Sequence, residues 1–339
     1  MSDPASSRVV PCVRIREPGG PGVLEPGVVE LPDPGPGQVR VRVAVSGVNR
    51  ADLIQRRGAY PPPPGFPAEI PGLEFAGVVE EVGPGCTLRA VGDPVMGILG
   101  GGGYAAGVVL PERETIAVPP ALDLVEAGAV PEVFLTAWDA LFLQAGLQAG
   151  ETVLIHAVGS GVGTAGLQLA RSAGARTVGT SRTPEKLDRA LELGLDLAVT
   201  GDDGWPGRVL DATRGRGVDV ILDLVGAAYL EGNLEVLARG ARWIVVGVPG
   251  GSRGEVDLRR LMSRRALIRG TVLRARPGEE KARLARDFER LVVPRFEAGE
   301  LVPVVDRVLP AREAAEAHRL MEENRNFGKL LLFWDGHPD

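Results

Sequence analysis

The stretch ETVLIHAVGSGVGTAGLQLARSAGARTVGTSRTPEK, residues 151–186, decides the fold of this chain. An apolar run over 152–157 leads into a glycine-rich turn, and the turn opens into a segment with helical apolar periodicity from Val162. A second β-branched run follows at 177–180. This order predicts a strand, a turn, a helix and a second strand. Such a unit holds a pyrophosphate where the backbone N–H groups at the start of the helix point at the anion.

The glycines of the turn fit a dinucleotide-binding pattern in two registers. The segment GVGTAG at 161–166 matches G-x-G-x-x-G literally, and A-x-x-S-x-x-G at 157–163 is an alternative one register earlier. Glycines let the backbone approach a phosphate with no Cβ in the way. The flanking strand and helix make the pattern specific, and they predict that the pyrophosphate contacts the backbone of Gly161, Val162 and Gly163.

The end of the second strand indicates which dinucleotide is bound. NAD sites usually carry Asp or Glu about 20 residues past the glycine turn, where the acid binds the ribose 2′-hydroxyl. Here the strand ends in TSRT at 180–183, without an acid. Arg182 and, one helical turn later, Lys186 suit a 2′-phosphate, because Arg offers a fork of donors that matches phosphate geometry. We therefore predict NADPH as the cofactor; the alternative is that both residues form a solvated helix start.

Size and composition limit the other classes of protein. The chain has 339 residues, 44% of them hydrophobic and 24% charged, which fits one or two globular domains with substantial cores. No apolar stretch is long enough to span a bilayer and the N-terminus lacks the features of a secretory signal, so we expect a cytoplasmic protein without membrane contact. A net charge of −6 disfavours nucleic acid as a partner. Cys12 and Cys86 are too few for a disulfide framework or a cysteine zinc site.

The pattern along the chain predicts two domains. Residues 1 to about 130 are rich in strands and turns, and VRVRVAV at 39–45 alternates as a half-buried strand does. From 132 to 270 strands alternate with helices, which predicts a parallel, doubly wound sheet with its ligand beyond the carboxyl ends of the strands. Since six strands complete that sheet, the remaining chain is expected to return to the first domain. The strands expected in the sheet are 152–157, 176–180, 196–199, 218–224, 241–247 and 266–270, the helices between them start near Val162, Pro184, Trp205 and Ala228, and the later elements are helices at 279–298 and 311–323 and a strand at 329–334.

Several segments resemble one known family. They are GVNRADLIQRRGAYPPPPG at 47–65, PGLEFAGVVEEVGPG at 71–85, PEVFLTAWDALF at 131–142, the turn at 156–164 and NRNFGK at 324–329. With them the chain resembles the zinc-independent quinone oxidoreductases of the medium-chain dehydrogenase/reductase superfamily over nearly its whole length, and within them the p53-inducible group. The resemblance implies an α/β protein. It further implies a GroES-like, β-rich catalytic domain at 1–131 and 271–339, and a Rossmann NADP-binding domain, a doubly wound parallel sheet, at 132–270.

The resemblance also bears on metal binding. Zinc alcohol dehydrogenases of the superfamily carry Cys where this chain has Asn49 and His where it has Leu73. Neither residue supplies a thiolate or an imidazole, which are the ligands that catalytic zinc normally takes. We therefore expect no metal site, and a structural role for the remaining carboxylate, Glu74.

Without a metal, the cofactor carries the chemistry and the protein positions it. The resemblance implies an NADPH-dependent reduction of quinones, with a proton following from solvent or a nearby hydroxyl. Reduction of α,β-unsaturated aldehydes or ketones on the same scaffold is the alternative, since the two differ only in pocket shape. A third possibility, of a different class, is a non-catalytic NADPH-binding or RNA-binding protein like the crystallin relatives. The resemblance further implies a homodimer joined through the cofactor-domain sheet near 241–270.

The resemblance assigns further residues to the cofactor. Asn49, in the position of the lost metal ligand, is expected beside the nicotinamide. Asp52 is expected to organise the local turn, and Gly201 lacks the Tyr that many relatives place near the adenine or phosphate. The other expected contacts are Thr136 beside the nicotinamide, Gly247 and Val248 along a ribose, Leu273 through its backbone at the nicotinamide amide, and Asn326 as a late polar contact. Thr136 as a helix-interior residue and Asn326 as a left-handed turn residue are the competing interpretations.

Three side chains are weighed for the reactive end. Tyr60 precedes a proline run and is expected either to cover the substrate or to pack a turn. Ser160 either reaches the substrate oxygen or serves as a small residue that permits close backbone approach. With Asn49, these are the candidate catalytic residues. His156 ends the first strand of the sheet, and we expect it to be a hydrogen-bonded core histidine.

Overall fold

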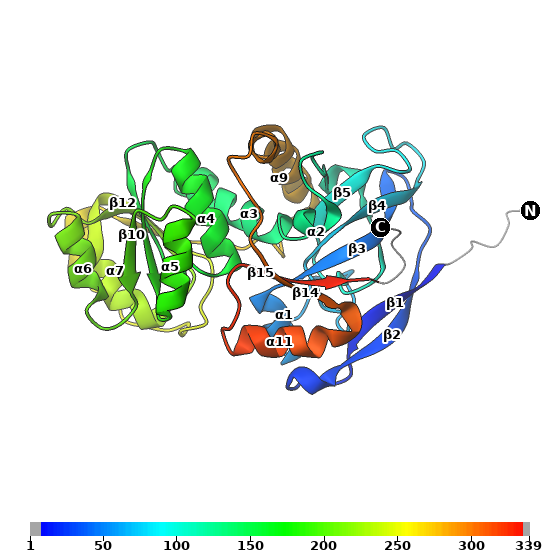
Figure 1. Ribbon diagram of the computed structural model, residues 1–339, viewed down its shortest axis with the longest axis horizontal. Helices are drawn as coiled ribbons and strands as arrows, with labels where there is room; N and C mark the ends of the chain where they lie inside the picture. Colours follow the sequence, from blue (N-terminus) through cyan, green and yellow to red (C-terminus); the bar gives the residue numbers. More distant parts are fainter. Residues whose placement is uncertain (1–7, 335–339) are drawn as a thin grey trace, which may run out of the picture. The chain divides into compact units, whose positions relative to one another are not determined.

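A computed structural model describes residues 8–334, and these form two compact units. One unit holds the described residues up to Leu135 together with those from Leu273 onward, and the other is Thr136–Val272. The second unit is thus inserted in the sequence of the first. The helices and strands of each are labelled in Figure 1.

The second unit is built on a six-stranded parallel sheet in the order β10-β9-β8-β11-β12-β13. Helices α4 and α5 cover one face of this sheet and α6 and α7 the other (Figure 1), which confirms the predicted doubly wound, Rossmann-type arrangement. The strands are β8 (Thr152–Ile155), β9 (Arg176–Ser181), β10 (Leu197–Thr200), β11 (Val218–Asp223), β12 (Leu237–Val245) and β13 (Leu267–Gly270), and the helices are α4 (Gly161–Ser172), α5 (Pro184–Glu192), α6 (Trp205–Ala212), α7 (Leu230–Val236) and α8 (Leu258–Arg264).

Burial explains why the middle strands form. All four residues of β8 are buried, as expected for a strand covered by helices on both faces. β12 differs most from the expectation, because it begins at Leu237 instead of 241. A β-bulge between Val218 and Val220 separates the early pairing of β12 from its main pairing with β11, and the segment LARG does not show the apolar run that the prediction relied on.

The first unit contains two sheets. A hairpin of β1 (Arg8–Ile15) and β2 (Leu24–Leu31) is separate from a seven-stranded sheet in the order β14-β15-β3-β4-β5-β7, with β6 also paired to β3. The larger sheet carries most of the unit's core, because valines 39, 41 and 43 of β3 are at most 1% exposed. Its strands are β3 (Gln38–Val48), β4 (Glu74–Val82), β5 (Pro94–Ile98), β6 (Gly107–Pro111), β7 (Thr115–Ala117), β14 (Val305–Pro310) and β15 (Lys329–Phe333).

The last part of the chain completes the first unit, as predicted. β15 pairs antiparallel with β3, from Leu330 opposite Val48 to Phe333 opposite Val45. The helix expected at 279–298 is broken into two, since Pro294 cannot donate the backbone hydrogen bond that a continuous helix requires. The helices of this unit are α1 (Arg50–Arg56), α2 (Leu124–Ala127), α3 (Pro131–Trp138, which runs into the second unit), α9 (Gly278–Leu291), α10 (Val293–Glu297) and α11 (Ala314–Glu322).

Helix α1 was not predicted, because the region before 130 was interpreted as strands and turns only. Its start is fixed by Asn49, whose backbone N–H donates to Asp52 Oδ2 at 2.8 Å. This contact confirms the expectation that Asp52 organises the local turn.

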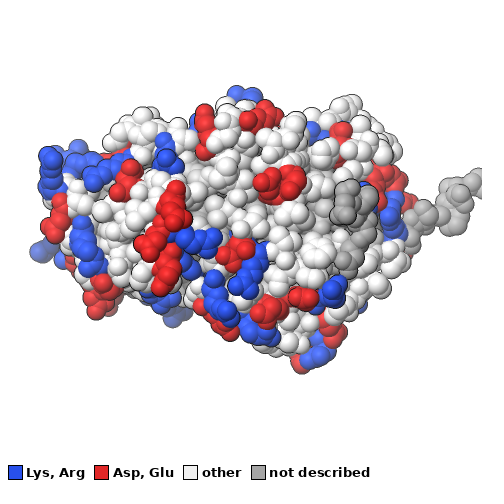
Figure 2. Space-filling view, in the orientation of Figure 1, with Lys and Arg blue, Asp and Glu red and all other residues white. Residues whose placement is uncertain are grey.

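Among residues 8–334, no helix has the length and apolar character needed to cross a bilayer. On the face in Figure 2, acidic and basic side chains are interspersed over most of the surface. Lys and Arg gather at the end of the second unit where α6 and β12 lie in Figure 1 and again along the lower middle of the view, in both places next to Asp and Glu.

Candidate functional site

The glycine turn between β8 and α4 is formed by residues 156–160. Ala157 has a φ of +48°, a left-handed conformation that is uncommon outside glycine. Ser160 is the N-cap of α4, and its Oγ accepts a hydrogen bond from Gly163 N at 3.1 Å. The turn therefore follows the A-x-x-S-x-x-G register at 157–163, and the literal GVGTAG match lies within the helix.

Gly163 occupies the position where the helix passes closest to the turn. A Cβ on Gly163 would lie 2.5 Å from Ala157 O and 2.6 Å from Val158 O, so no other residue fits. This is the close helix–strand packing that the last glycine of a dinucleotide motif provides. The start of the twelve-residue helix α4, at Gly161 and Val162, keeps free N–H groups for an anion. The turn thus fits the pyrophosphate of a nicotinamide dinucleotide.

A buried hydrogen-bonded chain lies behind this turn. His156 is fully buried, with Nδ1 2.8 Å from Thr180 Oγ1 and Nε2 2.6 Å from Asn233 Oδ1. Asn233 Nδ2 donates in turn to Asp223 Oδ2, and Trp243 Nε1 donates to the same oxygen at 2.9 Å. Burial lowers the pKa of His156. The expectation of a hydrogen-bonded core histidine is confirmed, and the chain ties together the carboxyl ends of several strands.

The structure places Arg182 and Lys186 as expected from the sequence, at the end of β9 and in the first turn of α5. Arg182 is exposed and Lys186 is half-buried. The space near Gly201 is filled by Tyr229, because a Cβ on Gly201 would lie 2.2 Å from Tyr229 Oη and 3.6 Å from Arg182 Cγ. Tyr229 Oη donates to Gly201 O at 3.1 Å. Position 201 thus lacks a tyrosine of its own, as the sequence shows, but the ring of Tyr229 from a later segment fills the adjacent space, which sequence position did not reveal.

Gly247 and Val248 follow β12 at the same carboxyl edge of the sheet. Gly247 N donates to Asp223 O at 3.3 Å, and Val248 is 46% exposed. Thr136, in α3, is buried. These positions are compatible with the predicted cofactor contacts, which stay predictions.

In the first unit, Asn49 belongs to a buried charged cluster with Glu74 and Lys329. Lys329 Nζ donates to Glu74 Oε1 at 2.5 Å, to Asn49 Oδ1 at 2.7 Å and to Val48 O at 2.9 Å. Asn49 Nδ2 donates to Glu74 Oε1 at 2.8 Å. Glu74 is fully buried and Lys329 is 3% exposed. The predicted structural role of Glu74 is thus that of a counter-ion to a lysine contributed by the last strand.

This donor set does not fit a catalytic zinc ion. The side chains that contact Asn49 offer two carboxylates, and both are already engaged: Glu74 accepts from Asn49 and Lys329, and Asp52 accepts from Asn49 N and Tyr104 Oη. None of these side chains offers a thiolate or an imidazole. In the part of the chain that the structure describes, no three His, Cys, Asp or Glu side chains are grouped so that they could hold a metal.

A second chain of hydrogen bonds adjoins the charged cluster. Tyr104 Oη donates to Asp52 Oδ2 at 3.1 Å and lies 2.9 Å from His318 Nε2, while Arg56 Nη1 lies 3.1 Å from His318 Nδ1. Burial and the neighbouring Arg56 cation lower the pKa of His318 to about 3. Burial raises the pKa of Asp52 to about 6. His318 is therefore neutral, accepting from Arg56 and donating to Tyr104.

Sequence reasoning missed Glu132 and Arg274. Burial and the nearby Glu74 carboxylate raise the pKa of Glu132 to about 8, so this acid is protonated at neutral pH. Arg274 donates to Gly100 O at 2.7 Å and to Tyr60 O at 3.0 Å, and its guanidinium lies 4.7 Å from the Tyr60 ring centre. The surroundings of Glu132, Arg274 and Tyr60 are formed by contacts between segments that are distant in the sequence, and no local sequence pattern predicts them.

Leu273 and Asn326 lie in the first unit and are both buried. Asn326 Nδ2 donates to Gly328 O at 2.8 Å. The left-handed residues of this segment are Asn324 and Gly328, with φ values of +54° and +81°, and so the competing interpretation of Asn326 as a left-handed turn residue is wrong.

These two units define a class of protein: a dehydrogenase-type oxidoreductase with a nucleotide-binding sheet and a β-rich partner. Two family models match, "Alcohol dehydrogenase GroES-like domain" at residues 35–120 and "Zinc-binding dehydrogenase" at residues 161–290. The quinone oxidoreductase of Rattus norvegicus is 31% identical over 96% of this chain and 98% of its own length. The chain belongs to the medium-chain dehydrogenase/reductase superfamily, whose enzymes use a nicotinamide cofactor, NAD or NADP.

Other relatives are much longer proteins. The phthioceranic/hydroxyphthioceranic acid synthase of Mycobacterium tuberculosis is 36% identical over 94% of this chain, and the chain spans only 15% of that protein's length. Two solved structures superpose closely. One is an NAD-dependent alcohol dehydrogenase, with a TM-score of 0.85, 36% identity and coverage of 95% and 99% of the two chains. The other is the CurK enoyl reductase, with a TM-score of 0.84, 26% identity and coverage of 96% and 99%.

Proposed function

We propose that this protein is an NADPH-dependent quinone reductase that works without zinc. The single observation that carries the choice of NADPH is the end of β9, where Arg182 stands and no acid does. A carboxylate at this place would accept from a ribose 2′-hydroxyl and repel a 2′-phosphate, whereas an exposed guanidinium offers the phosphate a fork of donors. Tyr229 Oη, close to Arg182, adds a polar group at the same place.

The likeness to the rat quinone oxidoreductase over nearly the full length of both chains supports the choice of quinone. The cofactor supplies hydride when bound. In the proposal, Gly161, Val162 and Gly163 hold the pyrophosphate by their N–H groups, and Ser160 orders that turn through its bond to Gly163 N. Thr136, Gly247, Val248, Leu273 and Asn326 are proposed to contact the rest of the cofactor.

The reactive end is proposed to include Asn49 and Tyr60. The Asn49 amide is fixed from both sides, since its oxygen accepts from Lys329 and its nitrogen donates to Glu74. Arg274 fixes the Tyr60 segment through the Tyr60 carbonyl and the face of its ring. A held amide and a held ring position a substrate without a metal, and a reduced quinone carries a delocalised charge that solvent can protonate.

A second candidate function is the reduction of conjugated enones or enoyl thioesters. The observation that favours it is the similarity to polyketide synthases and to the CurK enoyl reductase. Initial rates of NADPH oxidation with a naphthoquinone, an alkenal and a crotonyl thioester separate the two candidates. Turnover of the quinone at least as fast as the others supports the quinone reductase, and turnover of only the alkenal or thioester replaces it with the second candidate.

We also propose a homodimer that forms through β13. Among the residues that the structure describes, this strand pairs with β12 alone, and it is an edge of the sheet. Leu258, Met262 and Leu267, in α8 and β13, are 65%, 74% and 41% exposed. An unpaired edge beside exposed apolar side chains is suited to pairing with a second copy. Sedimentation equilibrium should give twice the chain mass, and Met262→Glu should lower the association.

A further inference from the structure

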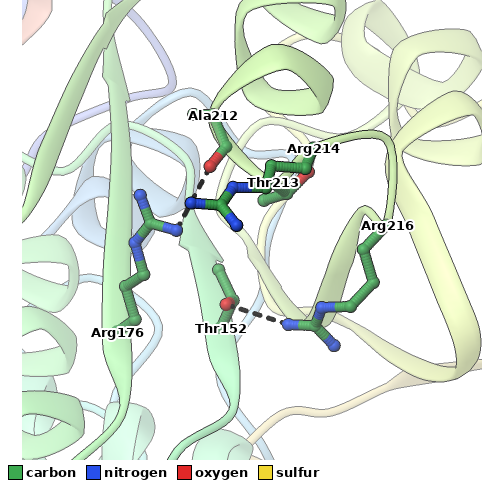
Figure 3. Close-up of a pocket in the computed structure, with 6 residues that line it drawn as sticks. All are labelled: Thr152, Arg176, Ala212, Thr213, Arg214 and Arg216. Carbon is green, nitrogen blue, oxygen red and sulfur yellow. Dashed lines mark hydrogen bonds between the residues drawn. The ribbon is translucent and has the colours of Figure 1, made fainter.

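A pocket lined by three arginines lies in the second unit, away from the glycine turn. It has a volume of about 240 Å³ and is lined by Thr152, Arg176, Ala212, Thr213, Arg214 and Arg216 (Figure 3). Thr152 and Arg176 are the first residues of β8 and β9. The glycine turn follows the last residue of β8, so the pocket and the turn lie at opposite edges of the same parallel sheet.

The charges in this pocket are not balanced. Arg216 donates to both oxygens of Asp219, at 2.7 and 2.8 Å, and to Thr152 Oγ1 at 3.1 Å. Arg176 donates to the carbonyl of Ala212 at 3.2 Å. Within residues 8–334, neither Arg176 nor Arg214 has a carboxylate at ion-pair distance, and Figure 3 shows the Arg214 side chain extending towards Arg176. Guanidinium groups that share a pocket repel each other, and an anion between them removes that repulsion.

The backbone conformation at Arg214 is one that glycine adopts more readily than arginine. Arg214 follows the end of α6 with a φ of +54°, and Gly215 and Gly217 also have positive φ values. A residue at this place after a helix is usually Gly or Asn, because a Cβ disfavours the left-handed region. The fold would therefore accept glycine at 214, and the cation that stands there instead makes no ion pair within the described chain.

We propose that this pocket binds a phosphate group, either as the free ion or as part of a small phosphorylated molecule. Arginine is suited to phosphate because its planar fork donates two parallel hydrogen bonds to two oxygens. Arg176 and Arg214 supply two such forks, and the Thr152 hydroxyl adds a donor and acceptor. The pocket volume of about 240 Å³ is several times the roughly 30 Å³ that a water molecule occupies in the liquid. The pocket is therefore large enough for a phosphate group and for part of a molecule that carries it. The site is separate from the nicotinamide site and does not depend on the proposed reaction.

The probe is inorganic phosphate, added to the full chain without nucleotide at constant ionic strength set with chloride. Melting temperature and the ³¹P line width are followed as phosphate rises. We expect a saturable rise in melting temperature, and Arg214→Gly and Arg176→Met should each raise the half-saturating concentration about tenfold. Arg214→Gly should melt at or above the native temperature in chloride, so that weaker binding is not caused by misfolding. Arg283→Ala removes the same charge from the exposed face of α9 in the first unit and should bind as the native chain does.

Two further arms locate the phosphate and its source. Arg182→Ala should keep the response, because Arg182 lies at the other edge of the sheet; loss of the response in this variant, with retention in Arg214→Gly, would overturn the proposal. The proposal would also be overturned if the melting temperature did not rise with phosphate, if the rise did not saturate, or if chloride produced the same rise. Ribose 5-phosphate is compared with ribose and with free phosphate. Tighter binding of the ester than of free phosphate identifies an organic phosphate as the natural ligand class, and equal binding identifies the free ion.

Discussion

In the first unit, an ammonium and carboxylates share one buried region, whereas in the second a single carboxylate is surrounded by neutral donors. Lys329 contacts Glu74, and Asp52 lies close by in the adjoining chain of hydrogen bonds. In the second unit Asp223 accepts from Val225 N, Gly226 N, Asn233 and Trp243. When one neutral donor to a carboxylate is removed by substitution, the carboxylate loses one hydrogen bond. When one partner of a buried ion pair is removed, the other partner stays buried with an uncompensated charge. The two units should therefore respond differently to similar substitutions.

The largest effect is expected from Lys329→Met. It leaves the Glu74 carboxylate buried without its counter-ion, which costs about 3–5 kcal/mol. Hydrogen exchange measured separately on peptides from β3 and β11 should show the first unit loosened and the second unchanged. The double variant Lys329→Met with Glu74→Gln should recover much of the protection, since it removes both charges. An equal rise in hydrogen exchange in both units would contradict the expected difference between them.

Arg182→Ala tests the second unit at its ligand-binding edge instead of its core. Loss of the charged hydrogen bonds to a 2′-phosphate should raise the free-energy barrier that corresponds to kcat/KM for NADPH by about 1.5–3 kcal/mol, and so lower kcat/KM by roughly 10- to 150-fold. NADH, which lacks the phosphate, serves as the internal control and should change little, and hydrogen exchange should be unaltered. The same loss with both nucleotides would contradict the proposed role of Arg182.

Glu132 gives the first unit a distinctive pH dependence. Its pKa rises from an ordinary 4.5 to about 8 in the folded chain. Between these values the folded state holds a proton that the unfolded state has released, so stability falls as pH rises from 4.5 to 8 and is level above that. Glu132→Gln should make this fall shallower and stabilise the protein at pH 8 by on the order of 2 kcal/mol. Urea unfolding at several pH values measures how the free energy of unfolding depends on pH. The same dependence in Glu132→Gln as in the native chain would show that Glu132 does not cause it.

His318 should produce a smaller effect in the opposite direction. Its pKa falls from 6.5 to about 3 on folding, and so the unfolded state binds the extra proton. The contribution of His318 to stability is complete above pH 6.5 and declines as pH falls towards 3, by about 1 kcal/mol between pH 6.5 and 5.5. His318→Asn should lower the overall stability and flatten this decline in hydrogen exchange on α11. A decline of the same steepness in that variant would assign it to other groups.

The two units also differ in how far the sequence predicted them. In the second, the glycine turn, Pro184 and the end of β9 lie within short stretches whose order along the chain is their order in space. The regular alternation of strand and helix thus predicted the sheet and located Arg182. What it did not reveal was Tyr229, which reaches Gly201 from a short 3-10 helix, Ala227–Tyr229, 28 residues later.

In the first unit the prediction gave the β-rich class and the return of the tail, but not the cluster at its centre. Asn49, Glu74 and Lys329 are separated by up to 280 residues and are brought together by strand pairing alone. No spacing rule connects them, and the sequence therefore predicted Asn49 and Glu74 singly and left Lys329 and Glu132 out. Helix α1 was missed for a related reason, since seven residues are too few for a clear apolar period.

The insertion of one unit within the other has a consequence for synthesis on the ribosome. β3 cannot pair with β15 until the ribosome has synthesised Leu330, the partner of Val48. At about 5–20 residues per second, synthesis of the chain between these two residues takes on the order of tens of seconds. Meanwhile the six strands of the second unit all emerge and can pair among themselves. A nascent chain stalled before residue 329 should therefore have a complete nucleotide-binding sheet, while the edge of β3 that β15 would cover is still unpaired. A chaperone would be expected to bind at that unpaired edge.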